Sequence, residues 1–169
     1  METIVNKVSQ SGLITLDPAA FFPAEEIVEF DLKDYLFMGL ILKEKDFREA
    51  LKNLDVATFI GKTVTITCSA DAIIPMWAYM LAVTKLQPVA ASVHTGTKTQ
   101  TETAIALNNI AAINNEEYKE AKLVIKGCGD KPIAETVYAA LTAKLLPVAQ
   151  SIMYGEPCST VPVYKKAKD

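Results

Sequence analysis

The residues with the clearest chemical potential in this chain are its cysteines and the aspartates that follow two of them. Cys68 precedes Asp71, Cys128 precedes Asp130, and Cys158 lies near the end of the chain. Thiolates bind soft metals and iron–sulfur species, and they act as nucleophiles. We therefore interpret all five residues as candidate metal or ligand-binding residues, with a metal or iron–sulfur species as the implied cofactor. The opposing interpretation is that the cysteines only pack, because free cysteine is among the most buried residue types.

Residues 127–132 have the composition of an anion-binding loop. Gly127 and Gly129 carry no side chain, so their backbone can approach a ligand closely. A helix expected directly after this loop favours negative charge at its start, and therefore also the thiolate form of a cysteine there. We predict that Gly127, Gly129 and Lys131 bind an anion. The alternative role for Asp71 and Asp130 is to cap the helices that follow them.

Common catalytic motifs are absent from the sequence. It contains no Walker loop, no Gly-x-Gly-x-x-Gly, no Cys-x-x-Cys and no His-Glu-x-x-His. His94 is the single histidine, so most histidine-based hydrolase or oxidase sites are excluded. A Cys128–His94 pair is arithmetically feasible, but nothing in the spacing selects it. We favour a non-catalytic protein over an enzyme.

The elements that must position these residues repeat along the chain. Two segments, roughly 45–97 and 104–156, align without a gap at an offset of 59 residues. The clearest identities in this alignment are Lys85/Lys144, Leu86/Leu145, Pro88/Pro147, Val89/Val148 and Ala90/Ala149. Similarity at a constant offset indicates a duplicated structural unit.

Each copy has the pattern of a helix, a β-branched strand, a second helix and a second strand. Apolar spacing predicts helices over 45–53 and 72–86 in the first copy, and over 102–113 and 131–145 in the second. Strands are expected over 63–67, 89–94, 122–126 and 148–153, with Pro88 and Pro147 ending the second helices. The N-terminal part adds expected strands over 13–16 and 27–32, while 37–42 fits either a strand or a helix start.

This pattern predicts an α/β fold with a mostly parallel sheet and flanking helices, built from two tandem β-α-β-α repeats plus an N-terminal extension. No long linker separates the copies, so we expect one domain over 1–169. Ligands of parallel sheets bind beyond the carboxyl ends of the strands. If the four strands of the two copies all run parallel, Cys68, Cys128 and Cys158 share one edge of the protein.

Composition and charge limit the classes of partner that this chain is expected to bind. The chain has 169 residues, a net charge of −3, 50% hydrophobic residues and a mean hydropathy of +0.20. The interspersed charges argue against nucleic acid. The start has no signal-peptide pattern and no apolar run is long enough to span a bilayer, so we expect a cytoplasmic protein with no membrane partner. An apolar face reserved for another subunit would explain the hydropathy, so we expect a homo-oligomer.

Four stretches resemble a bacterial family of unknown function. They read GCGDKP at 127–132, SIMYGEPCSTVP at 151–162, CSADAIIP at 68–75 and GLILKEKDFR at 39–48. Genes of that family are often found near those for iron–sulfur cluster assembly, so the resemblance implies iron–sulfur assembly proteins as partners. His94-Thr95-Gly96 departs from the more apolar residues of that family, which argues against a functional His94.

Three hypotheses remain open at this point. The first is a non-catalytic accessory or interaction protein, associated through the resemblance with iron–sulfur cluster assembly. The second is metal or cluster handling by Cys128 and Cys158. The third is a thiol-based sulfur carrier or redox protein, with Cys128 as nucleophile and Cys158 as the resolving partner.

Overall fold

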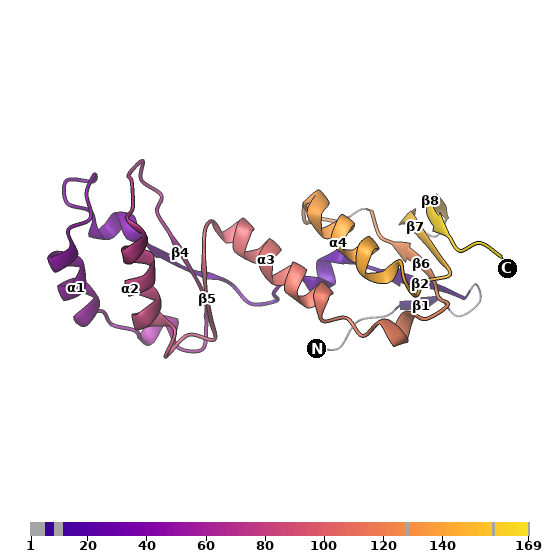
Figure 1. Ribbon diagram of the computed structural model, residues 1–169, viewed down its shortest axis with the longest axis horizontal. Helices are drawn as coiled ribbons and strands as arrows, with labels where there is room; N and C mark the ends of the chain where they lie inside the picture. Colours follow the sequence, from indigo (N-terminus) through magenta and orange to yellow (C-terminus); the bar gives the residue numbers. More distant parts are fainter. Residues whose placement is uncertain (1–5, 9–11, 128, 157, 169) are drawn as a thin grey trace. The chain divides into compact units, whose positions relative to one another are not determined.

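Two compact units, each built around its own sheet, make up the chain. The structure is a computed structural model that describes residues 6–8, 12–127, 129–156 and 158–168 (Figure 1). Unit 1 comprises Met1–Pro23 and Thr103–Asp169, and unit 2 comprises Ala24–Glu102. Unit 2 is therefore inserted into the chain of unit 1.

Unit 2 holds a three-stranded parallel sheet in the order β3-β4-β5. Its elements in chain order are β3 (Val28–Asp31), the 3-10 helix η2 (Leu32–Tyr35), α1 (Glu44–Lys52), η3 (Ala57–Phe59), β4 (Thr63–Thr67), α2 (Met76–Leu86) and β5 (Ser92–Thr95). Each crossover helix connects neighbouring parallel strands, as in a βαβ unit.

Unit 1 holds a sheet in the order β1-β2-β6-β7-β8. Its elements are β1 (Asn6–Val8), β2 (Leu13–Leu16), η1 (Pro18–Phe21), most of α3 (Lys98–Ala111), η4 (Asn115–Tyr118), β6 (Lys122–Ile125), α4 (Glu135–Leu145), β7 (Ser151–Glu156) and β8 (Ser159–Lys165). The three central strands are parallel, and β1 and β8 add to the two edges in antiparallel orientation.

The two units are copies of one design. At the offset of 59 residues, β6 and β7 correspond to β4 and β5, and α4 corresponds to α2. The first strands also correspond, because Ile14 pairs with Leu123 as Val28 pairs with Val64. In both units an aspartate ends this strand and begins a 3-10 helix, which makes Asp17 the counterpart of Asp31.

In each unit the helices cover one face of the sheet. Val64 and Ile66 of β4 point to the same side, and both belong to a buried cluster with residues of α1 and α2. Leu123 and Ile125 of β6 play the same part in unit 1, packing with α3 and α4. In β4 threonines alternate with Val64 and Ile66, whereas β6 is apolar at three successive positions.

The predicted α/β class, the mostly parallel strands and the tandem repeat are confirmed. Several predicted details are wrong. α2 and α4 begin four residues later than predicted, after Pro75 and Ala134, so neither Asp71 nor Asp130 caps a helix. Residues 37–42 form a tight turn closed by a Phe37–Ile41 bridge instead of a strand or helix.

The expectation of a single sheet is also wrong, because the strands of the two copies belong to different sheets. Cys68 follows β4 of unit 2, whereas Cys158 lies between β7 and β8 of unit 1. The one shared rim that would have gathered the cysteines is therefore not formed. That residues 1–169 form one domain stays a prediction. In the part of the chain that the structure describes, every helix is too short or too polar to cross a bilayer.

Candidate functional site

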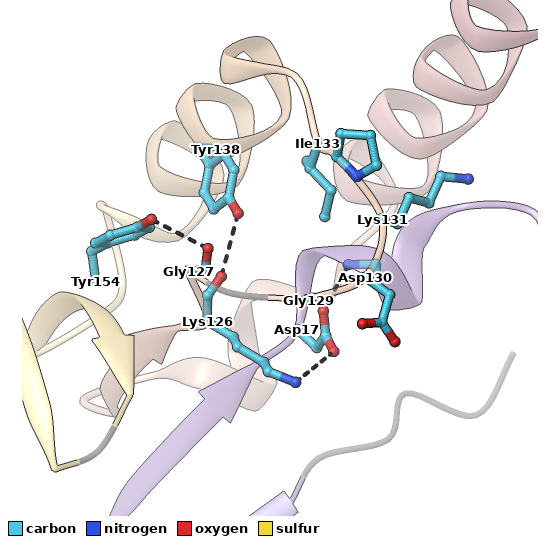
Figure 2. A pocket seen from close by; sticks show the side chains of 11 residues that line it. Asp17, Lys126, Gly127, Gly129, Asp130, Lys131, Ile133, Tyr138 and Tyr154 are labelled. Atoms are coloured by element: carbon cyan, nitrogen blue, oxygen red, sulfur yellow. Dashed lines mark hydrogen bonds and ion pairs between the residues drawn. The ribbon is translucent and has the colours of Figure 1, made fainter.

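A cavity of about 730 Å³ opens at the carboxyl ends of the parallel strands of unit 1 (Figure 2). Asp17 directly follows β2, Lys126 directly follows β6, and Tyr154 belongs to β7. The loop between β6 and α4 supplies most of the remaining lining, namely Gly127, Gly129, Asp130, Lys131, Pro132 and Ile133. Parallel α/β sheets bind their ligands in this place, because the loops after adjacent strands diverge there.

Two lysines and two aspartates give the cavity a mixed charge. The Lys126 ammonium lies 3.6 Å from the Asp17 carboxylate. That carboxylate also accepts a hydrogen bond of 2.9 Å from the Ala19 N–H. The Lys131 ammonium lies 4.5 Å above the ring of Phe22, a cation–π contact. Asp130 is exposed, and no hydrogen bond or ion pair holds it within the described residues.

Two tyrosines hold the start of the β6–α4 loop. The Tyr138 hydroxyl donates to the Lys126 carbonyl at 3.5 Å, and the Tyr154 hydroxyl donates to the Gly127 carbonyl at 3.3 Å (Figure 2). The two rings contact each other edge to face, with centroids 5.9 Å apart. Consecutive carbonyls are thus fixed from two different elements, α4 and β7, which defines the backbone path where the cavity begins.

Gly127 is required by this arrangement. A Cβ atom at this position would overlap the ring of Tyr154. At the equivalent positions of unit 2 stand Cys68 and Thr95. The first residue is therefore larger, and the second smaller, than in unit 1.

In unit 2 the corresponding aspartate is bound by residues of its own unit. Asp31, the counterpart of Asp17, accepts hydrogen bonds from the Ser69 hydroxyl at 2.6 Å and from the Ser69 N–H at 3.1 Å. It also accepts from the Lys33 N–H at 3.0 Å. Partial burial raises the pKa of Asp31, but the hydrogen bonds from Ser69 and Lys33 outweigh it, so this pKa is lowered.

The structure brings together four of the predicted site residues and separates others. Gly127, Gly129, Asp130 and Lys131 line the same cavity. Asp71 is exposed on the equivalent loop of unit 2. Cys128 lies outside the described residues, so the prediction that it binds a ligand or metal stays open.

The two described cysteines differ in their surroundings. Cys68 is half-buried against the core of unit 2, and its thiol donates to the Ala70 carbonyl at 3.6 Å. Cys158 is exposed in the turn between β7 and β8, so it is not a core residue. Within the residues that the structure describes, no three His, Cys, Asp or Glu side chains gather into a group that would hold a metal ion.

Sequence reasoning missed Asp17, Lys126 and the two tyrosines of the site. Asp17 and Lys126 follow strands that are adjacent in the sheet but far apart in the chain. A usable signal was present, because Asp17 precedes a proline after a strand, as expected for a residue that begins a 3-10 turn.

Comparison with known proteins assigns the chain to a family but gives no function for it. The chain belongs to the family described as "Protein of unknown function (DUF2480)", whose model matches residues 2–166. No curated protein and no solved structure matches it.

Proposed function

We propose that this member of the DUF2480 family is a cytoplasmic, non-catalytic accessory protein whose unit 1 binds a small molecule carrying an anionic group. The observation that carries the proposal is the cavity at the carboxyl ends of β2, β6 and β7, lined by Lys126, Lys131 and a loop with two glycines. Its volume, about 730 Å³, falls in the range typical of small-molecule sites.

Lys126 is the residue best suited to meet the anionic group. Its side chain keeps 35% of its surface exposed, and its ion pair with Asp17 is long, at 3.6 Å. A carboxylate or phosphate oxygen of the ligand can therefore share the ammonium, which has three donors. Gly127 and Gly129 have no side chain, so their backbone is open beside it. The N-cap of α4, Ala134, makes no side-chain hydrogen bond to the first N–H groups of this helix, which therefore suit an anion.

The acidic residues restrict the ligand further. Asp17 and Asp130 both line the cavity. A ligand with several negative charges would meet repulsion from both carboxylates. The lining therefore favours a ligand that combines one anionic group with hydrogen-bond donors, such as an amino acid or a sugar monophosphate, over a nucleoside triphosphate.

The comparison between the two units supports the same site. In unit 2, the Asp31 carboxylate accepts two hydrogen bonds from Ser69. In unit 1, Asp17 is held by Lys126 and by a backbone N–H within the described residues, and a cavity lies beside it. The ion pair of 3.6 Å between Asp17 and Lys126 is longer than the Ser69–Asp31 hydrogen bonds, so ligand groups compete with it more easily.

Ligand-observed NMR and isothermal titration calorimetry with amino acids and sugar monophosphates test the proposal. We expect at least one class to bind, and Lys126→Gln to weaken that binding about tenfold, since a charge-assisted hydrogen bond contributes about 1.5–3 kcal/mol. Lys45→Gln is the matched control, because Lys45 is an exposed lysine of unit 2. Equal losses in both variants, or no binding by any class, would contradict the proposal.

The cysteine chemistry is a second candidate, favoured by the exposure of Cys158. In this alternative Cys128 and Cys158 act as a thiol pair or hold a metal or iron–sulfur species, in contact with iron–sulfur assembly proteins. Elemental analysis of anaerobically purified protein, repeated on Cys128→Ser, separates the versions. Bound metal lost in the variant supports metal handling, rapid alkylation of a metal-free protein supports thiol chemistry, and an inert, metal-free protein removes both.

A further inference from the structure

Unit 2 exposes an apolar hairpin at the carboxyl end of β3. Four large apolar side chains between η2 and α1 lie mainly in solvent: Phe37, Met38, Leu40 and Ile41, with exposed fractions of 46, 79, 63 and 60%. Surfaces of this kind are uncommon on isolated proteins and mark interaction sites when they are contiguous.

The hairpin has a defined backbone, so the exposure is not a property of a loose segment. The Phe37 N–H donates to the Ile41 carbonyl at 2.7 Å, and the Leu40 and Ile41 N–H groups both donate to the Phe37 carbonyl. Met38 and Gly39 have φ angles of 53° and 70°, the signature of a type I′ turn. Lys43 places its ammonium 3.3 Å from the centre of the Phe37 ring, which fixes this ring as well.

The loop after β4 presents two more apolar side chains at the same end of unit 2. Ile73 is 93% exposed and Met76, at the start of α2, is 70% exposed. The bases of the two loops are joined, because Asp31 accepts two hydrogen bonds from Ser69. Figure 1 shows both loops extending beyond the same end of unit 2. We call this set of residues the apolar rim: Phe37, Met38, Leu40, Ile41, Ile73 and Met76.

We propose that the apolar rim is the interface of a homodimer, in which it packs against the same rim of a second copy across a twofold axis. The six side chains of the rim are apolar, with the Lys43 ammonium over the Phe37 ring, and apolar side chains can pack against copies of themselves across a twofold axis. The low net charge of −3 gives little repulsion between two copies. Methionines at two of the six positions adapt readily to an apolar partner surface.

The area of the rim agrees with this occupant. A methylene-sized group has an accessible surface of about 30 Å². Scaled by the exposed fraction of each residue, the six side chains therefore expose about 500 Å² of apolar surface. A standard interface covers about 800 Å² on each partner, of which a little more than half is apolar. One rim per copy therefore supplies the apolar part of a stable dimer interface without a further element.

Sedimentation velocity of the full chain between about 1 and 100 µM, a range that covers weak and moderate affinities, tests the proposal. We expect a species of about twice the chain's 18.4 kDa. Ile41→Glu and Ile73→Glu should each weaken the dimer at least tenfold, because a charge is then buried at the interface. Two separate positions are used so that a folding defect in one variant does not decide the result.

Ile60→Glu is the matched control, because Ile60 is also 60% exposed and lies in unit 2, but it follows η3 and precedes β4 at the amino end of the sheet. This variant should remain dimeric. A monomer at all concentrations, or equal weakening by Ile60→Glu, would overturn the proposal. So would a monomer that sediments with phosphatidylcholine–phosphatidylglycerol vesicles through Ile41 and Ile73, which would assign the rim to a lipid surface.

Discussion

Asp17 and Asp31 hold equivalent positions in the two units and have different partners. Asp31 ends β3 and Asp17 directly follows β2, and each accepts a hydrogen bond from the N–H two residues later, at 2.9 Å in Ala19 and 3.0 Å in Lys33. Beyond this shared turn, Asp31 binds Ser69 and Asp17 pairs with Lys126. The same local turn therefore presents its carboxylate to a serine of the next loop in unit 2 and to a lysine that lines a cavity in unit 1.

The lowered pKa of Asp31 predicts a loss of stability in acid. Because the hydrogen bonds from Ser69 and Lys33 hold the folded pKa below the ordinary value of 3.8, the carboxylate stabilises the folded protein above that value. This stabilisation is lost as the pH falls below 3.8 through the lowered pKa. Urea unfolding between pH 3 and pH 7 should show this acid loss, and Ser69→Ala should reduce both the acid loss and the stability at pH 7.

The cost of Ser69→Ala at pH 7 should be about 1 kcal/mol, as for a typical hydrogen bond of an exposed pair. Ser159→Ala, which changes an exposed serine of unit 1, is the control and should leave the pH profile unchanged. An acid loss of the same size in wild type and Ser69→Ala would show that other groups cause it.

Gly127→Ala should destabilise unit 1 and close the cavity. The new Cβ overlaps the Tyr154 ring, so this ring must move and release the Gly127 carbonyl. Overpacking of this kind costs about 1–3 kcal/mol of unfolding free energy. The control is Gly129→Ala, two residues along the same loop, where a Cβ meets no described atom within 4 Å.

The second copy of the repeat suggests a rescue of this variant. Cys68 and Thr95 of unit 2 combine a larger first residue with a smaller second one. Gly127→Ala combined with Tyr154→Thr should therefore lose less stability than the two single changes added together. Chemical denaturation of the four proteins measures this coupling, and strict additivity would refute the proposed steric link.

Much of the fold was readable in the sequence because the two copies align without a gap and each central strand, β4 and β6, is buried at three successive positions. The alignment of Pro88 with Pro147 located both crossover helices and the parallel strands around them. The relation between Asp17 and Asp31 was not readable, since four-residue strands with one shared aspartate carry too little pattern. Their offset of 14 residues also differs from the offset of 59 elsewhere, because unit 2 is inserted after the first strand of unit 1.

Part of the site could also be predicted, because some of its residues lie close together in the sequence. Gly127, Gly129, Asp130 and Lys131 lie within five residues of the chain, so composition alone identified their loop. Asp17 reaches the cavity only through the pairing of β2 with β6, and strand order is not encoded in local pattern. The starts of α2 and α4 were predicted too early for a further reason. Their N-cap residues, Pro75 and Ala134, make no side-chain hydrogen bond, and such a cap is the feature by which a helix start is located in a sequence.

Met38→Asn should stabilise the folded chain while it weakens the homodimer. Met38 adopts a left-handed conformation, φ 53°, that costs a methionine about 1 kcal/mol and that asparagine adopts more readily. The same change removes an apolar side chain that is 79% exposed from the apolar rim. The midpoint of thermal unfolding should therefore rise, while the fraction of dimer in sedimentation velocity falls. A variant that loses both stability and dimer would contradict the role given to this turn.

Thr65→Val should destabilise unit 2 although unit 1 has a valine at the same place. Thr65 is fully buried and donates to the Gly96 carbonyl at 2.9 Å, while it accepts a hydrogen bond of 2.8 Å from the Thr101 hydroxyl. Valine would leave the buried Thr101 hydroxyl and the carbonyl without these partners, at a cost of about 1–3 kcal/mol. Its counterpart in unit 1, Val124, is equally buried, so size and burial alone do not require a hydroxyl at this position.

The double variant Thr65→Val with Thr101→Val separates the hydrogen bond from the packing. Replacing both hydroxyls with methyl groups of similar size removes the unpaired donor, so the double variant should be more stable than Thr65→Val alone. Urea denaturation of the wild type, both single variants and the double variant closes this cycle. If the two single losses simply add, Thr101 does not depend on Thr65, and the buried threonine pair does not join the start of α3 to β4.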